Sequence, residues 1–211
     1  MKQVFAKLAA ALLSAGLCSA AHATLIEQDF KTAGDGLLIL DTATNRQWVD
    51  VTHTTGLTVN GFFSSSIYAG KGFQLATMAD VAKFYQDAGA TTLTYGGGTN
   101  QVASNYNAAV LLNNLMEHSS PYTDTAGNSW VHGYTDVGTN PTVGLSRFLL
   151  QNSTATFDIN SNGGWSRDTS HSSIGVFAWR AAPAGVPEPA SLALFGIGLA
   201  GAAVLRRRRK A

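Results

Sequence analysis

An uncharged apolar run followed directly by a basic block constrains this chain of 211 residues more than any other feature. Residues 190–205 contain no charged side chain, and five basic residues follow them: Arg206, Arg207, Arg208, Arg209 and Lys210. As a helix these residues span about 24 Å, against roughly 30 Å of hydrocarbon, and arginine side chains can reach across part of the difference. We therefore expect a marginal transmembrane helix at 190–205 and a basic cytoplasmic tail at 206–211. A permanent single-span anchor is the alternative.

The other end of the chain has the layout of a secretory signal peptide, which we assign to residues 1–23. Lys2 and Lys7 supply the positive start, and residues 8–17 are small or apolar apart from one serine. Ala21 and Ala23 give the small-x-small pattern of a signal peptidase site. The apolar run is too short for a stable span. The only cysteine, Cys18, lies in this segment, so the expected mature chain has no disulfide.

The middle of the chain is mildly acidic. From residue 24 to residue 187 there are seven Lys and Arg residues and twelve Asp and Glu residues, a formal charge of −5. Binding to nucleic acid phosphates needs clustered Lys and Arg, and no such cluster occurs here. We therefore expect no nucleic acid partner.

A proline-spaced acidic motif joins the middle of the chain to the apolar run. It consists of Val186, Pro187, Glu188, Pro189 and Ala190. The prolines favour an extended backbone that a processing enzyme could grip as a strand. Motif, apolar span and arginine-rich end together resemble the PEP-CTERM protein-sorting signal.

The PEP-CTERM resemblance implies a Gram-negative bacterium and exosortase, a membrane-embedded cysteine transpeptidase that cleaves at or near the motif. It also implies a link to exopolysaccharide and biofilm formation. The expected partners are therefore exosortase, signal peptidase, the general secretion machinery, the inner membrane before processing, and exopolysaccharide. The processed protein is expected at the cell surface or outside the cell. Between the signal peptide and the transmembrane helix we expect two segments. They are a globular domain at 24–182 and a linker with the sorting motif at 183–189.

Local signals in the middle region predict two helices. Thr77 and Asp80 have the spacing of a capping box, with Asp in place of the usual Glu, and Gly89 follows where that helix should end. Its expected apolar face is Val81, Phe84 and Tyr85. The second helix has apolar residues at helical spacing, namely Ala108, Leu111, Leu112, Leu115 and Met116.

Short apolar or alternating runs predict the strands. The candidates are residues 37–40, 47–51, 130–134, 147–150, 154–159 and 174–180, and residues 56–72 are expected to form loops. This order of elements predicts a single α+β domain with two helices and short antiparallel strands.

The predicted domain resembles a fold shared by C-type lectin-like domains and several bacterial surface families, and three of its segments resemble stretches of other PEP-CTERM proteins. Asp41 with residues 48–52 matches an Asp-rich turn that leads into a Trp-Leu-Asp-Leu-Thr stretch. Residues 72–77 replace a Gly-Trp-Arg stretch, but Phe73 and Gln74 depart from its Trp-Arg pair. Residues 175–180 are similar to the last strand of that family. The resemblance implies a C-type lectin-like fold.

Few residue patterns indicate binding chemistry. Asp158, Asn160 and Asn162, followed by Gly163, fit the first half of a calcium loop. The twelfth position is Thr169 instead of Glu, so a polar turn between strands is the favoured interpretation. The histidines at 53, 118, 132 and 171 lack metal-ligand spacing. Trp165 follows two glycines in a polar stretch and is the best candidate for stacking on a sugar, whereas Trp48 and Trp179 are expected in the core.

No nucleophile elbow, phosphate-binding loop or metalloprotease motif occurs. We therefore predict a non-enzymatic surface or matrix protein without a cofactor, calcium excepted. The alternatives are a carbohydrate-binding module and a secreted hydrolase.

Overall fold

A computed structural model describes residues 24–116, 122–123, 129–138 and 142–183. The chain divides into two units, residues 1–181 and 182–211. The predicted signal peptide, sorting motif, transmembrane helix and basic tail lie outside the described residues. Within the described ranges, no helix has the length and apolarity needed to cross a bilayer.

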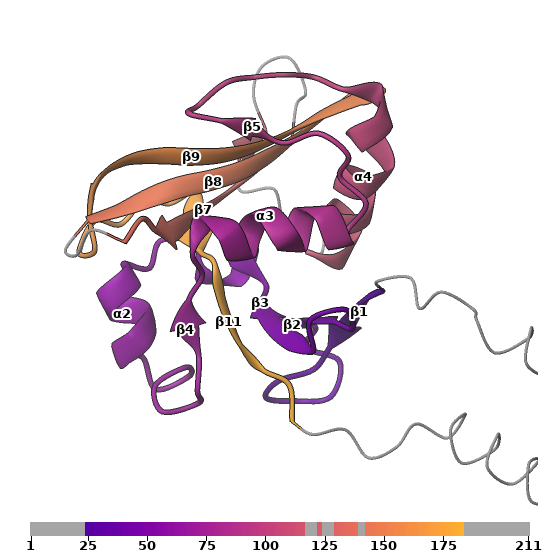
Figure 1. Cartoon of the computed structure of the whole chain (residues 1–211). Helices are drawn as coiled ribbons and strands as arrows, with labels where there is room; N and C mark the ends of the chain where they lie inside the picture. Colours follow the sequence, from indigo (N-terminus) through magenta and orange to yellow (C-terminus); the bar gives the residue numbers. More distant parts are fainter. Residues whose placement is uncertain (1–23, 117–121, 124–128, 139–141, 184–211) are drawn as a thin grey trace, which may run out of the picture. The chain divides into compact units, whose positions relative to one another are not determined.

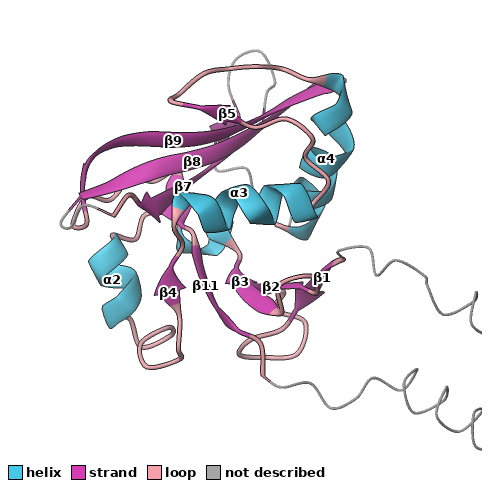
Figure 2. Ribbon diagram, in the orientation of Figure 1, coloured by secondary structure: helices cyan, strands magenta, loops and turns pink. Residues whose placement is uncertain are grey.

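The described part of the first unit is a mixed α+β domain with two sheets, which confirms the predicted class (Figure 2). The first sheet is antiparallel and has the order β1-β2-β3-β11-β4. Its strands are β1 (Leu25–Gln28), β2 (Leu38–Asp41), β3 (Arg46–Val49), β4 (Gln74–Leu75) and β11 (Ala178–Ala181).

The second sheet has the order β10-β7-β8-β9-β5, with β6 paired to β7. Its strands are β5 (Thr94–Tyr95), β6 (Tyr122–Thr123), β7 (Ser129–Asp136), β8 (Thr142–Gln151), β9 (Thr154–Ser166) and β10 (Ile174–Val176). The pairs β10–β7 and β5–β9 are parallel, so the expectation of antiparallel strands alone is wrong.

Helix α3 (Met78–Asp87) lies between the two sheets (Figure 1). The predicted capping box is present, because the side chains of Thr77 and Asp80 each accept a hydrogen bond from the other's backbone N–H. The Phe84 ring stacks on Trp48 of the first sheet with centroids 4.5 Å apart. The ring of the next residue, Tyr85, packs against Phe157 of the second sheet with centroids 4.7 Å apart. One short helix therefore supplies apolar surface to both sheets.

The second predicted helix is α4 (Tyr106–Leu115), preceded by the 3-10 helix η2 (Ala103–Asn105). Ala108, Leu112 and Met116 are buried, as the spacing predicts. Leu111 is 37% exposed, so it lies at the edge of the apolar stripe.

The sequence prediction was wrong about residues 56–72, which contain a third helix, α2 (Val59–Ser64). Thr58 caps it by accepting a hydrogen bond from the N–H of Gly61 at 2.7 Å, and Val59 and Phe62 are buried. Six residues are too few to display helical periodicity. Strands β8 and β9 are also much longer than the short strands expected, at 10 and 13 residues.

The predicted strand at 174–180 is split between the two sheets at Phe177. β10 joins the second sheet beside β7, and β11 joins the first sheet beside β3. Phe177 donates its N–H to the Tyr134 carbonyl and accepts from the Ala76 N–H, at 3.1 and 2.8 Å. Beside β10 is the 3-10 helix η1 (Val51–Thr54). A Cβ atom at Gly175 would overlap the Val51 carbonyl oxygen there, so only glycine fits.

Candidate functional site

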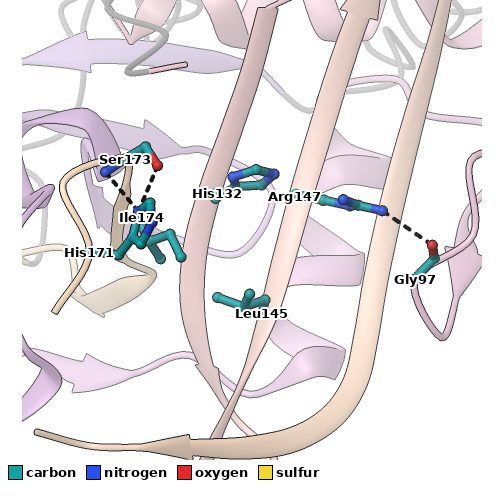
Figure 3. A pocket seen from close by; sticks show the side chains of 7 residues that line it. All are labelled: Gly97, His132, Leu145, Arg147, His171, Ser173 and Ile174. Atoms are coloured by element: carbon teal, nitrogen blue, oxygen red, sulfur yellow. Dashed lines mark hydrogen bonds between the residues drawn. The ribbon is translucent and has the colours of Figure 1, made fainter. Parts of the chain in front are cut away.

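A cavity of about 470 Å³ opens on the second sheet (Figure 3). Its lining is Gly97, His132, Leu145, Arg147, His171, Ser173 and Ile174. Strand register explains how distant residues meet here. Ile174 is paired with His132, His132 with Arg147, and Arg147 with Asp158, across β10, β7, β8 and β9. Directly paired residues project from the same face of a sheet, so these residues form one row.

The opposite face of the same strands is part of the core. Val131 is paired with Phe148, and Phe148 with Phe157, and all three are buried. They pack in the cluster that includes Tyr85 of α3 and Leu112 of α4. Alternation along β7, β8 and β9 therefore places the apolar row against the helices and the polar row at the cavity.

Arg147 is held in place from three directions. Its Nε donates to Asp158 Oδ2 and its Nη2 donates to the Gly97 carbonyl, both at 3.2 Å. Asp158 Oδ1 accepts a hydrogen bond from the Gly97 N–H at 3.2 Å. This bond joins the loop after β5 to the ion pair of Arg147 and Asp158. The guanidinium carbon lies 4.7 Å from the centroid of the Trp130 ring, a cation–π contact.

Asp158 is the buried half of this ion pair. Its side chain is 0% exposed, against 25% for Arg147. Burial raises the pKa of the Asp158 carboxyl, while Arg147 and the Gly97 N–H act in the opposite direction. The carboxylate thus lies behind the guanidinium and orients it, and it is not part of the cavity lining.

His132 is a half-buried imidazole beside Arg147. Its pKa is lowered from 6.5 to about 4, mainly by burial and further by the charges of Arg147 and His171. The ring is therefore neutral at physiological pH. Its Nε2 is buried and has no hydrogen-bond partner within the described part of the chain.

His171 and Ser173 form the other side of the cavity. The Ser173 hydroxyl lies 2.7 Å from His171 Nδ1, which also accepts the Ser173 backbone N–H at 3.2 Å. A serine hydroxyl beside an imidazole is the pairing used in nucleophilic catalysis. Here the two residues are nearly adjacent and share a backbone hydrogen bond, so the contact also stabilises a local turn.

The C-terminal end of the chain matches a known family model. A family model described as the PEP-CTERM protein-sorting motif matches residues 185–209. The chain carries a PEP-CTERM protein-sorting motif at this end. The motif implies that exosortase sorts the protein and that it is anchored in the membrane before export. No curated protein and no solved structure matches the chain.

The calcium-loop pattern lies within a strand and not in a separate turn. Residues 154–166 form strand β9, so the expectation of a polar turn is wrong. The side chains of Asn160 and Asn162 lie outside the described residues, and both Asp158 oxygens accept hydrogen bonds. Among the residues described, no cluster of three or more His, Cys, Asp or Glu could hold a metal. Calcium binding stays a prediction.

The tryptophans lie largely as the sequence predicts. Trp165 is 37% exposed, and its ring meets Tyr134 edge-on at 6.4 Å. Trp48 is buried. Trp179 is half-buried, with the Arg46 guanidinium carbon 3.7 Å from its ring centroid.

Two of the four histidines without metal-ligand spacing line one cavity, which sequence reasoning missed. His132 lies within β7 and His171 beside β10, and no local spacing joins them. His53 lies on η1, with its Nε2 3.6 Å from Asp50 Oδ2, and His118 falls outside the described residues. Only the pairing of β10 with β7 brings the two cavity histidines together.

Proposed function

We propose that this chain is a non-enzymatic surface or matrix protein of a Gram-negative bacterium. Exosortase removes its C-terminal tail, and the processed protein acts in the exopolysaccharide layer of a biofilm. The observation that carries the proposal is the sorting motif at residues 185–209.

Charge at the two ends supports the proposed direction of export. Lys2 and Lys7 precede the first apolar run, and five basic residues follow the second. The positive-inside rule keeps both groups in the cytoplasm, so the segment between the two apolar runs crosses the membrane. The domain that crosses is the acidic part of the chain, which suits a solvated protein outside the cell.

Mass spectrometry of the mature C-terminus tests this proposal. In a strain with exosortase, the surface protein should lack residues 206–211. In a strain without exosortase, the chain should keep them and stay in the membrane fraction. The double change Pro187→Ala with Pro189→Ala should have the same effect as loss of the enzyme. Pro183→Ala, outside the matched motif, should be processed normally. Surface protein that retains Arg206 would refute exosortase processing.

Carbohydrate binding on a C-type lectin-like fold is the second candidate. The exposed ring of Trp165 favours it, because sugars stack on accessible indole rings. On a glycan array, loss of binding in Trp165→Ala would support this function over a passive matrix role. Loss of binding on chelation would assign calcium to it as well.

A further inference from the structure

We propose that the cavity on the second sheet binds a carboxylate-bearing sugar, such as a uronic acid unit of an acidic polysaccharide. The inference deepens the proposed function and rests on it for placing the protein among polysaccharides. The chemistry of the ligand comes from the lining residues themselves.

The charge of the lining favours an anion. Arg147 supplies a guanidinium cation, and none of the seven described lining residues is acidic. The Asp158 carboxylate lies behind the guanidinium and is fully buried. The guanidinium plane of Arg147 is fixed by two hydrogen bonds, from Nε to Asp158 and from Nη2 to the Gly97 carbonyl. Arg147 Nη1 donates no hydrogen bond to any residue that the structure describes. It can therefore donate one to a carboxylate oxygen of a ligand.

The remaining lining suits the rest of a sugar ring better than a bare ion. Leu145 and Ile174 provide apolar surface for C–H groups. The neutral His132 ring carries one donor and one acceptor, which matches a hydroxyl, and its buried Nε2 has no described partner. The Ser173 hydroxyl and His171 supply further polar contacts on the other side (Figure 3). The volume of about 470 Å³ accommodates one or two sugar units.

A divalent cation is the main competing ligand, because two histidines share the cavity. Hard cations need carboxylate or carbonyl oxygens, and softer ones need several nitrogen or sulfur ligands. None of the lining residues that the structure describes is a carboxylate, and the positive charge of Arg147 repels a cation. Both arguments favour the carboxylate.

Titration of the full chain in mild detergent with glucuronate tests the proposal, with glucose as the matched neutral sugar. Glucuronate should bind at least about tenfold more tightly than glucose, and it should shift the imidazole NMR signals of His132 and His171. Arg147→Lys keeps a positive charge beside Asp158 but lacks the planar fork, so it should lose most of this preference. Arg167→Lys, at an arginine outside the lining, should keep it.

Absence of glucuronate binding at about 10 mM, or equal binding of glucose, would overturn the proposal. Equal binding of inorganic sulfate would overturn the sugar part and leave a simple anion site. If a folded Arg147→Lys protein still preferred glucuronate to glucose as strongly as the wild type, the cavity would not be the binding site. The C-terminal mass measurement reports on sorting alone, so failure of binding and failure of the proposed function are distinguished.

Discussion

Acidification provides a quantitative test of the burial of His132. Its pKa is about 4 in the folded protein, against an ordinary value of 6.5. Above pH 6.5 neither the folded nor the unfolded chain protonates this ring, and its contribution to stability is fully present. As the pH falls from 6.5 toward 4, the unfolded chain binds a proton that the folded chain does not, so stability is lost.

The expected loss follows from the gap between the two pKa values. Each pH unit of the gap corresponds to about 1.4 kcal/mol, so the free energy of unfolding should fall by roughly 2–3 kcal/mol, allowing for solvent that reaches the half-buried ring. Other groups titrate over the same range, so the relevant quantity is a difference between proteins. His132→Gln removes this titration and should be correspondingly less sensitive to acid.

Urea unfolding at about pH 7.5 and pH 4, followed by tryptophan fluorescence, measures that difference. His171→Gln, at the exposed histidine of the same cavity, is the control. It should retain most of the acid sensitivity of the wild type, because burial is the largest cause of the lowered His132 pKa. If His132→Gln and the wild type lose equal stability between the two pH values, the ring is not buried in the neutral form. The described geometry of the cavity would then be incorrect.

Two further predictions concern close packing and helix capping. Gly175→Ala places a methyl group against the Val51 carbonyl and should destabilise the protein by about 1–3 kcal/mol in urea unfolding. Gly164→Ala, in β9 with no atom near the added methyl group, should change stability little, and equal effects would contradict the close approach. Thr77→Ala removes one half of the α3 capping box and should cost about 1 kcal/mol. A thermal melt identical to the wild type would show that the cap contributes nothing.

Elements with strong local signals were predictable from the sequence. Helix α3 has its capping residues, its apolar face and a terminal glycine within a dozen positions, and the structure confirms each of them. Gly89 has a φ of 103°, which explains the need for glycine after the helix. Helix α4 was predictable for a similar reason, because its apolar residues repeat at helical spacing.

Elements that depend on distant partners were not predictable. The Asn- and Gly-rich stretch at 160–164 indicates a turn, yet it lies within strand β9, at a shift in the register between β8 and β9. Pairing with β8 on both sides of this irregularity keeps the stretch within the strand despite its local preference. The cavity was missed for the same reason, since it depends on the register of four strands. The sorting motif is recognised as a linear sequence, and it was therefore readable without the fold.

The crossing of the chain at Phe177 has a consequence for the order in which the domain is completed. β11 lies between β3 and β4, so the interior of the first sheet is filled by the last folded segment of the unit. A chain that emerges from a membrane with its N-terminus first leaves the edges of β3 and β4 unpaired until residue 181 has emerged. Unpaired edges invite aggregation. A tail that delays release until those residues are outside would protect the chain during this interval, and cleavage at or near residues 186–190 would leave β11 whole.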